Sequence, residues 1–273
     1  MAPLPSSRKI HIDPSLYDWQ QSPSNPNTYQ RRAIGFENKW VHQAAMYRQM
    51  FLSGMISLKI PLTRHDFMRA AETAWLRLKF QHPEVTMVCR LKGASGDAMT
   101  ECVLPEDENK ANEWAKRSLT FSVGHKIDGG GHLRVETELR ALDINDPVCL
   151  RLLTHEVEDS ERLSEASYAF CVDHQCMDGM SAYLVADCFF HIFAAEMESK
   201  EHKAIDWRQC AENLAPPWIS IMNDKQLTEG ETFDQAVQKS VKMLVDSAVC
   251  PVIALGVHYT ASLTLLSRSC NGV

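Results

Sequence analysis

The chain has 273 residues, of which 45% are hydrophobic and 23% charged, and its net charge is −7 at pH 7. This composition is typical of globular proteins, and the length suffices for one large domain or two modest ones. The negative charge argues against nucleic-acid binding, because phosphate contacts need a concentrated Lys and Arg surface.

The cysteines and the apolar segments indicate the compartment. Nine cysteines are scattered without a C-x-x-C pair, which favours reduced thiols over a disulfide framework. The N-terminal residues lack the apolar core of a signal peptide. The apolar segment 248–266 is interrupted by Pro251 and Gly256, so we expect no membrane span. We therefore expect a reduced, cytoplasmic protein without a structural metal cluster.

The first 60 residues are expected to be irregular and then extended. Residues 1–30 are rich in Pro, Ser, Asn and Gln, which is typical of an arm or loop on the surface. The following stretch predicts a short helix or turn and then a strand that ends near Ile60.

Residues 63–82 have the pattern of an amphipathic helix. Thr63 is a suitable N-cap, Asp66 follows three residues later as in a capping box, and Pro83 ends the helix. We expect His82 at the helix end. The apolar residues of one helical face are Phe67, Ala70, Ala71, Ala74, Trp75 and Leu78.

The middle of the chain mixes strands and helices. Residues 85–91 and 147–157 read as strands, and residues 132–140 alternate apolar and polar side chains as a half-buried strand does. Residues 107–121 read as a charged helix, and 232–249 as a further helix. The elements do not alternate strictly, so we expect an α/β (α+β) two-layer sandwich with a mixed β-sheet and flanking helices.

A compact apolar strand, residues 168–174, ends in His174 and is followed by a predicted helix over 180–197. Met180, Leu184, Cys188 and Ile192 share one face of that helix. A histidine at the end of a buried strand can take a proton from a hydroxyl, amine or thiol nucleophile. Asp178 would fix the corner through backbone N–H groups or an arginine, and Gly179 would let the chain reverse. The spacing alone favours a core histidine before a turn, because His-x-x-x-Asp recurs often by chance.

The segment VDHQCMDGMSAYLVADCFF, residues 172–190, resembles the His-x-x-x-Asp-Gly signature of the chloramphenicol-acetyltransferase-like superfamily, which includes the BAHD and fungal trichothecene-type acyltransferases. FMRAAETAWLRLKFQHPEV, residues 67–85, is similar to the first-half helix of that superfamily. ENLAPPW, residues 212–218, is similar to the segment that closes the first half. The resemblance covers roughly residues 55 to 220.

The resemblance implies roles for three residues and one co-substrate. His174 would be the general base, Asp178 a structural aspartate, and Gly179 would leave room beside the substrate channel. The acyl donor would be acyl-CoA, with no permanently bound cofactor and no metal, and the acceptor a hydroxyl or amine of a small molecule in secondary metabolism. Asp173 stands where condensation domains commonly carry a first histidine, which favours a stand-alone O- or N-acyltransferase.

The sequence departs from the family in its second half. The Asp-Phe-Gly-Trp-Gly type motif of that half is absent from the sequence, so we interpret residues 1–218 as an N-terminal half-domain and 219–273 as a crossover linker with the start of an incomplete second half. The apolar face meant for the other half would need a cover, such as the residues after 218, a homodimer partner or a separate second-half chain.

Three hypotheses remain open from the sequence. The first is an acyl-CoA-dependent acyltransferase with His174 as base. The second is a catalytically silent homologue that acts as a binding or regulatory subunit. The third is a non-acyl reaction, such as a cyclisation, on the same scaffold. Cys176, inside the motif, is interpreted as a packing residue because no partner is implied for it.

Overall fold

The computed structural model describes residues 14–35, 37–38, 41–42, 49–92, 97–124, 146–155, 162–199, 204–217 and 261–264. The chain divides into two compact units, Met1–Trp19 with Pro216–His258 and Gln20–Ala215 with Tyr259–Val273. The first unit contains the 3-10 helix η1, Pro14–Tyr17. All the other described elements belong to the second unit, which carries the motif residues His174, Asp178 and Gly179.

Two β-sheets form the frame of the second unit. The four-stranded sheet is antiparallel and has the order β1 (Gln20–Ser22), β2 (Asn25–Arg32), β5 (Asp97–Val103) and β4 (Val88–Lys92). The five-stranded sheet is mixed and has the order β6 (Leu119–Gly124), β7 (Val148–His155), β8 (Arg162–Asp173), β3 (Gln49–Thr63) and β9 (Ala261–Thr264).

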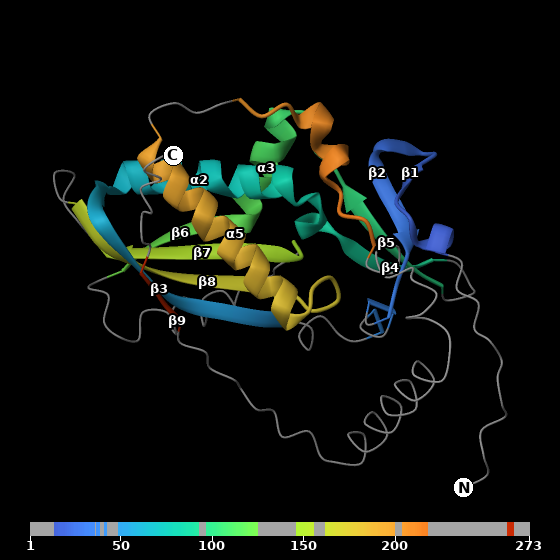
Figure 1. Ribbon diagram of the computed structural model, residues 1–273, viewed down its shortest axis with the longest axis horizontal. Helices are drawn as coiled ribbons and strands as arrows, with labels where there is room; N and C mark the ends of the chain where they lie inside the picture. Colours follow the sequence, from blue (N-terminus) through green and yellow to red (C-terminus); the bar gives the residue numbers. More distant parts are fainter. Residues whose placement is uncertain are drawn as a thin grey trace, which may run out of the picture. The chain divides into compact units, whose positions relative to one another are not determined.

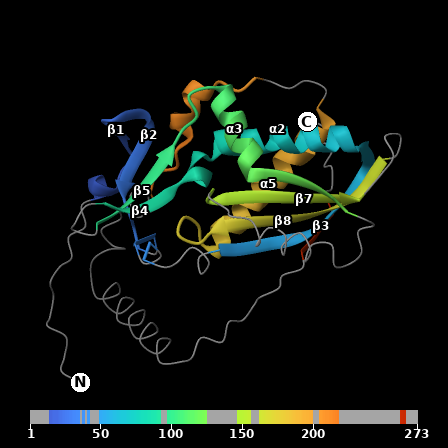
Figure 2. The same ribbon diagram turned by 180° about the vertical axis from the view of Figure 1, so that it is seen from behind.

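Helices cover one face of the five-stranded sheet, as Figures 1 and 2 show from opposite sides. They are α2 (Arg64–Gln81), α3 (Glu108–Ser118) and α5 (Gly179–Glu198). Two short 3-10 helices complete the unit: η3 (Pro83–Thr86), which follows α2, and η4 (Trp207–Asn213), which lies beside its C-terminal end. The mixed sheet with flanking helices confirms the expected fold class.

The local signals of α2 are confirmed. Thr63 Oγ1 accepts a hydrogen bond from the Asp66 backbone at 3.1 Å and donates one to the Asp66 carboxylate at 2.7 Å. His82 is the C-cap, with Pro83 directly after it, and every apolar residue predicted for the buried face is buried. The capping pair and the proline therefore fix both ends of the helix.

Aromatic side chains form the core between sheet and helices. Trp75 of α2 stacks on Trp114 of α3 with ring centroids 5.3 Å apart, and its Nε1 donates to Ser118 at 2.8 Å. Phe170 of β8 and Phe189 of α5 pack against Trp75. In length and composition α5 resembles a membrane-crossing helix, but its phenylalanines lie in this core, which explains its apolar character.

Some expectations need correction. Residues 20–32 are not an extended arm, because they form β1 and β2 and pair with β5. In segment 85–91 the 3-10 helix η3 continues to Thr86 before β4 begins, and the predicted helix 107–121 ends at Ser118, where β6 follows. The strand predicted at 132–140, the helix at 232–249 and the apolar segment 248–266 lie outside the described residues, apart from the short strand β9.

Helix α5 turns its predicted apolar face outward. Met180 and Leu184 are 68% and 61% exposed, and Tyr183 is also exposed. The side of α5 that faces the core carries Ala182, Ala186, Phe189, Phe190 and Phe193. The helix is therefore apolar on both sides at its N-terminal end, next to the motif.

Candidate functional site

The turn between β8 and α5 carries the motif, and Asp173 organises it. The Asp173 backbone N–H donates to Pro147 O at 2.7 Å, and its side-chain Oδ1 accepts from the Gln175 backbone at 2.8 Å. Its carbonyl accepts from the Cys176 backbone at 3.0 Å. An aspartate that accepts from the backbone two residues on forms an Asx turn, so the backbone on both sides of His174 is fixed.

Two buried side chains anchor this turn to the four-stranded sheet. Gln175 Nε2 donates to Cys89 O at 2.7 Å, and Cys176 Sγ contacts Met87 O, also at 2.7 Å. Gln175 is only 1% exposed, which is unusual for an amide side chain and requires a partner of this kind. The packing role predicted for Cys176 is confirmed, since the residue is buried and contacts the neighbouring chain segment.

His174 itself lies at the first position of the turn and is partly buried. Of its two chain neighbours, Asp173 is partly buried as His174 is, whereas Gln175 is buried. The Nδ1 atom of its ring is buried, while the residue as a whole keeps part of its surface.

Asp178 is the N-cap of α5. Its Oδ1 accepts from the Ser181 backbone N–H at 2.7 Å, which is the first of the two roles that the sequence allowed. The backbone hydrogen bond from Ser181 lowers the pKa of the Asp178 carboxyl below its usual 3.8, and the nearby His174 adds a smaller effect in the same direction. The histidine and the aspartate of the motif therefore lie close enough to interact electrostatically.

Gly179 is the first residue of α5, and its backbone does not need glycine. Among the described residues the positive φ is at Gly35, with φ 53°, so the expected chain reversal at Gly179 is wrong. A Cβ at position 179 would find no atom within 4 Å. The chain as it stands leaves open space beside this residue.

Two further histidines of the described residues do not join the turn. His191 is exposed on α5, and His155 ends β7. The described residues contain no group of three or more His, Cys, Asp or Glu arranged to hold a metal ion. The seven described cysteines are free thiols.

Sequence reasoning missed Gln175 and two charged residues behind it, Arg31 and Glu37. Gln175 lies inside the motif between His174 and Cys176, where nothing in the sequence singled it out. Arg31 directly follows the stretch expected to be an arm or loop, and Glu37 lies in the stretch expected to be a short helix or turn, so neither carried a signal for a buried ion pair.

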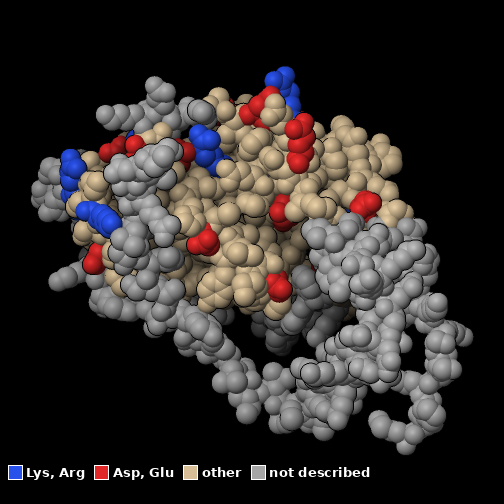
Figure 3. All heavy atoms as spheres, viewed as in Figure 1, with Lys and Arg blue, Asp and Glu red and all other residues tan. Residues whose placement is uncertain are grey.

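The surface around α5 has few basic residues. Figure 3 shows scattered acidic side chains on the described part of this face and no gathering of Lys or Arg. A polyanion would find no basic surface on this described face, in agreement with the net charge.

Comparisons with known proteins agree with the fold. The family model described as 15-O-acetyltransferase Tri3 matches residues 11–261. The trichothecene 15-O-acetyltransferase TRI3 of Fusarium sporotrichioides is 24% identical over 265 residues, which are 90% of this chain and 50% of that protein. The solved structure of TRI3 superposes with a TM-score of 0.69 at 23% identity, covering 89% of this chain and 50% of that one. The chain thus spans about half the length of these relatives.

Proposed function

Because the chain belongs to the Tri3 15-O-acetyltransferase family, we propose that it takes part in acyl transfer from acyl-CoA to a hydroxyl group of a small molecule, with His174 as general base. The observation that supports the proposal most directly is the partly buried His174 on a turn whose backbone is fixed on both sides. Asp178 and Gly179 start the next helix directly behind it.

The proposed reaction needs one proton acceptor. The acceptor oxygen attacks the carbonyl carbon of the thioester while the His174 imidazole takes its proton. The bond from carbon to sulfur then breaks, and the imidazole returns the proton to the departing thiolate of coenzyme A. Fixing the imidazole before the substrates arrive lowers the barrier, because no conformational freedom is lost in the reaction step.

A direct test compares wild type with His174→Ala in the presence of acetyl-CoA and a panel of hydroxylated acceptors, and follows free-thiol release. General base catalysis contributes typically ~10²–10⁴-fold, so we expect a loss of that order. His191→Ala is the matched control, since His191 is exposed on the neighbouring helix away from the turn. Equal thiol release by wild type and His174→Ala would remove His174 from the mechanism.

The exposed N-terminal end of α5 supports a second candidate function, that of a subunit without turnover of its own. Met180, Tyr183 and Leu184 lie exposed beside the motif, and the chain spans half the length of its relatives. Exposed apolar side chains that cluster in this way are typical of surfaces that bind another protein. The partner would be a second copy of the chain or a separate chain corresponding to the other half of the family fold.

Light scattering and pull-down with such a second-half chain separate the two candidates. Under the subunit hypothesis wild type associates and Leu184→Lys does not, while acyl transfer is absent from the chain alone. Turnover by a monomer at all concentrations would rule this candidate out.

A further inference from the structure

A buried ion pair far from the motif in the sequence lies behind its turn. Glu37 and Arg31 are 5% and 6% exposed and form a bidentate pair, in which Arg31 Nη1 donates to Glu37 Oε2 at 2.9 Å and Nη2 donates to Oε1. Glu37 Oε2 also accepts from the Ile34 backbone N–H and the Thr100 hydroxyl, each at 2.9 Å. The carboxylate therefore has four donors.

Such a pair is costly to bury, and its geometry is specific. Removing two charges from water carries a penalty that only close, well-satisfied contacts offset. Bidentate Arg–carboxylate contacts fix orientation as well as distance. The pair joins β2 to the segment that follows it and, through Thr100, to β5.

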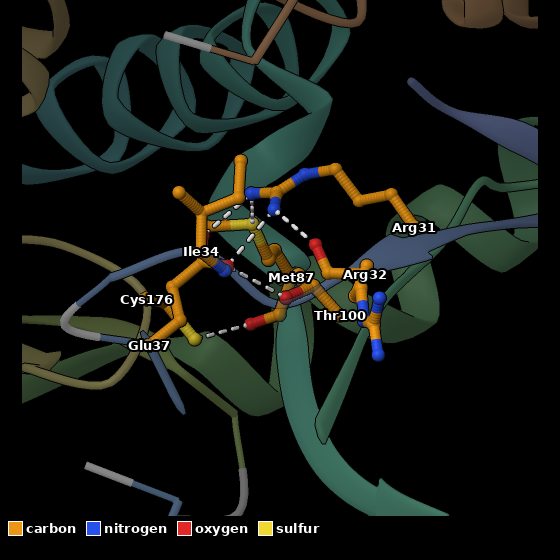
Figure 4. Close-up of polar contacts among 7 residues, drawn as sticks. All are labelled: Arg31, Arg32, Ile34, Glu37, Met87, Thr100 and Cys176. Atoms are coloured by element: carbon orange, nitrogen blue, oxygen red, sulfur yellow. Dashed lines mark hydrogen bonds and ion pairs between the residues drawn. The ribbon is translucent and has the colours of Figure 1, made fainter. Parts of the chain in front are cut away.

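Met87 connects this pair to the motif. Its Sδ lies 3.6 Å from Arg31 Nη2, and its carbonyl oxygen is the one that Cys176 Sγ contacts. Figure 4 shows Arg31, Glu37, Met87 and Cys176 in one cluster, with the thiol of Cys176 directed to the backbone of Met87. The Gln175 side chain reaches the carbonyl of Cys89, two residues further along the same segment.

We propose that Glu37 and Arg31 are positioning residues for His174, acting through the segment Met87–Cys89 and the buried side chains of Gln175 and Cys176. The motif turn follows β8 of the five-stranded sheet, and its anchors, Met87 and Cys89, lie directly before and within β4 of the four-stranded sheet. The ion pair would therefore fix the position of the turn relative to the four-stranded sheet. The catalytic meaning of this inference rests on the proposed function, whereas the mechanical connection does not.

Hydrogen exchange measures the connection without any turnover. The amides of Gln175 and Cys176 donate to Asp173, so a fixed turn protects them. In Glu37→Gln we expect exchange in a peptide spanning 173–178 to accelerate at least tenfold, while the centre of β8 keeps its protection. Met87→Leu keeps the side-chain volume but removes the sulfur contact with Arg31, and we expect a smaller acceleration in the same peptide.

Glu196→Gln is the matched control. Glu196 pairs with Arg77 and is 7% exposed, but it lies at the far end of α5, roughly 25 Å along the helix from Gly179. The control loses an ion pair whose carboxylate is buried and whose arginine is 23% exposed, and we expect its turn to exchange as in wild type. If the folded Glu37→Gln and Met87→Leu variants exchange as wild type does, or if Glu196→Gln opens the turn equally, the inference is wrong.

Kinetics gives a second measurement wherever wild type turns over. A positioning defect lowers kcat and leaves the KM for acetyl-CoA within about twofold, and Gln175→Glu, which removes the donor to Cys89 O, behaves as Glu37→Gln does. Wild type without turnover would count against the proposed function alone, because the exchange experiment still decides whether Glu37 holds the turn. If Glu37→Gln does not fold, the exchange rates of Met87→Leu and Glu196→Gln decide between the two outcomes.

Discussion

Asp178 shows how one motif residue can be assigned from geometry. Its carboxylate caps α5 through the Ser181 backbone N–H, and this hydrogen bond is the main reason why its pKa is lowered. The aspartate therefore stabilises the start of helix α5. The structural role that the family resemblance implied has a plain physical basis here.

We expect Asp178→Ala to lower the free energy of unfolding by about 1 kcal/mol and Asp178→Asn by only a few tenths, because asparagine also caps helices. The charge-dependent part has a defined pH range. Because the pKa of Asp178 is lowered in the folded protein, the stabilisation by its charge is complete above the ordinary carboxyl pKa of 3.8. This stabilisation is lost as the pH falls through the pKa of the folded state. Thermal unfolding of wild type and Asp178→Asn between pH 2 and 6 measures the stabilisation that depends on the charge. If the stabilities of the two proteins change in parallel with pH, the prediction is wrong.

Substitution of Gly179 can show whether the glycine is needed for folding or for binding. Because a Cβ there meets no atom within 4 Å and the backbone φ is not positive, Gly179→Ala should leave stability unchanged or raise it by up to about 1 kcal/mol. Urea unfolding measures this. A loss of acyl transfer or association in the stable variant would show that the open space is used, whereas a loss of stability would refute our description of the position.

Helix α5 has two faces that should respond differently to substitution. Phe193 is fully buried and packs edge-on against Phe67 at 5.3 Å, whereas Leu184 is 61% exposed. We expect Phe193→Ala to cost about 3–5 kcal/mol of unfolding free energy and Leu184→Ala less than about 0.5 kcal/mol. Chemical denaturation of both variants tests this, and similar costs would mean that Leu184 is covered in solution.

Helix α2 carries a lysine in its buried face. Lys79 is 3% exposed, its Nζ donates to Thr86 Oγ1 at 3.1 Å, and it lies 4.6 Å from the Trp114 ring centroid. Burial lowers the pKa of Lys79 from 10.5 to about 8. At neutral pH the folded protein therefore holds an ammonium group that would be more stable in water.

We expect Lys79→Met to raise the free energy of unfolding at pH 7 by about 1–2 kcal/mol, since about 3 kcal/mol of desolvation cost is removed and the contacts with Thr86 and Trp114 are lost. The folded pKa lies below the unfolded one, so the penalty disappears as the pH rises from about 8 to 10.5. The measurement is the difference in unfolding free energy between wild type and Lys79→Met from pH 7 to 10.5. The buried thiols are common to both proteins, so their titration cancels in this difference. A difference independent of pH would contradict the prediction.

The elements with strong local signals could be predicted from the sequence. Helix α2 has a cap, a stop and a periodic apolar face, and β8 with α5 has an apolar run followed by the motif. The strands β1 and β2 could not, because Pro, Asn and Gln in residues 20–30 favour loops locally, and they become strands by pairing with each other and, for β2, with β5. Likewise His174, Asp178 and Gly179 were singled out through the family resemblance of a contiguous segment, whereas Glu37 and Thr100 meet across 63 positions.

The five-stranded sheet depends on a segment near the end of the chain. Strand β9 pairs in parallel with β3, so that Gly54–Ser57 have a neighbour on the side away from β8. Without β9, β3 becomes an edge strand with unpaired backbone groups along those residues. Exposed edges of this kind pair readily with other chains.

We therefore expect a protein that ends at His258 to aggregate faster than the full chain, because it loses β9 and retains the rest of the described fold. A protein that ends at Ser267 retains β9 and is the control. Light scattering at a fixed concentration and temperature compares the aggregation rates of the full chain and the two shortened proteins. Equal aggregation of the two shortened proteins would show that β9 does not protect the edge.

The Arg31–Glu37 pair also bears on how shortened or rearranged versions of this protein should be interpreted. A fragment that starts at Gln49 still contains every letter of the signature, yet it lacks the charged residues that stand behind the anchors of the turn. Such a fragment would be recognised by its motif, but the turn that carries His174 would be held less firmly. Under the proposed positioning role, an intact site depends on the first forty residues as well as on the signature itself.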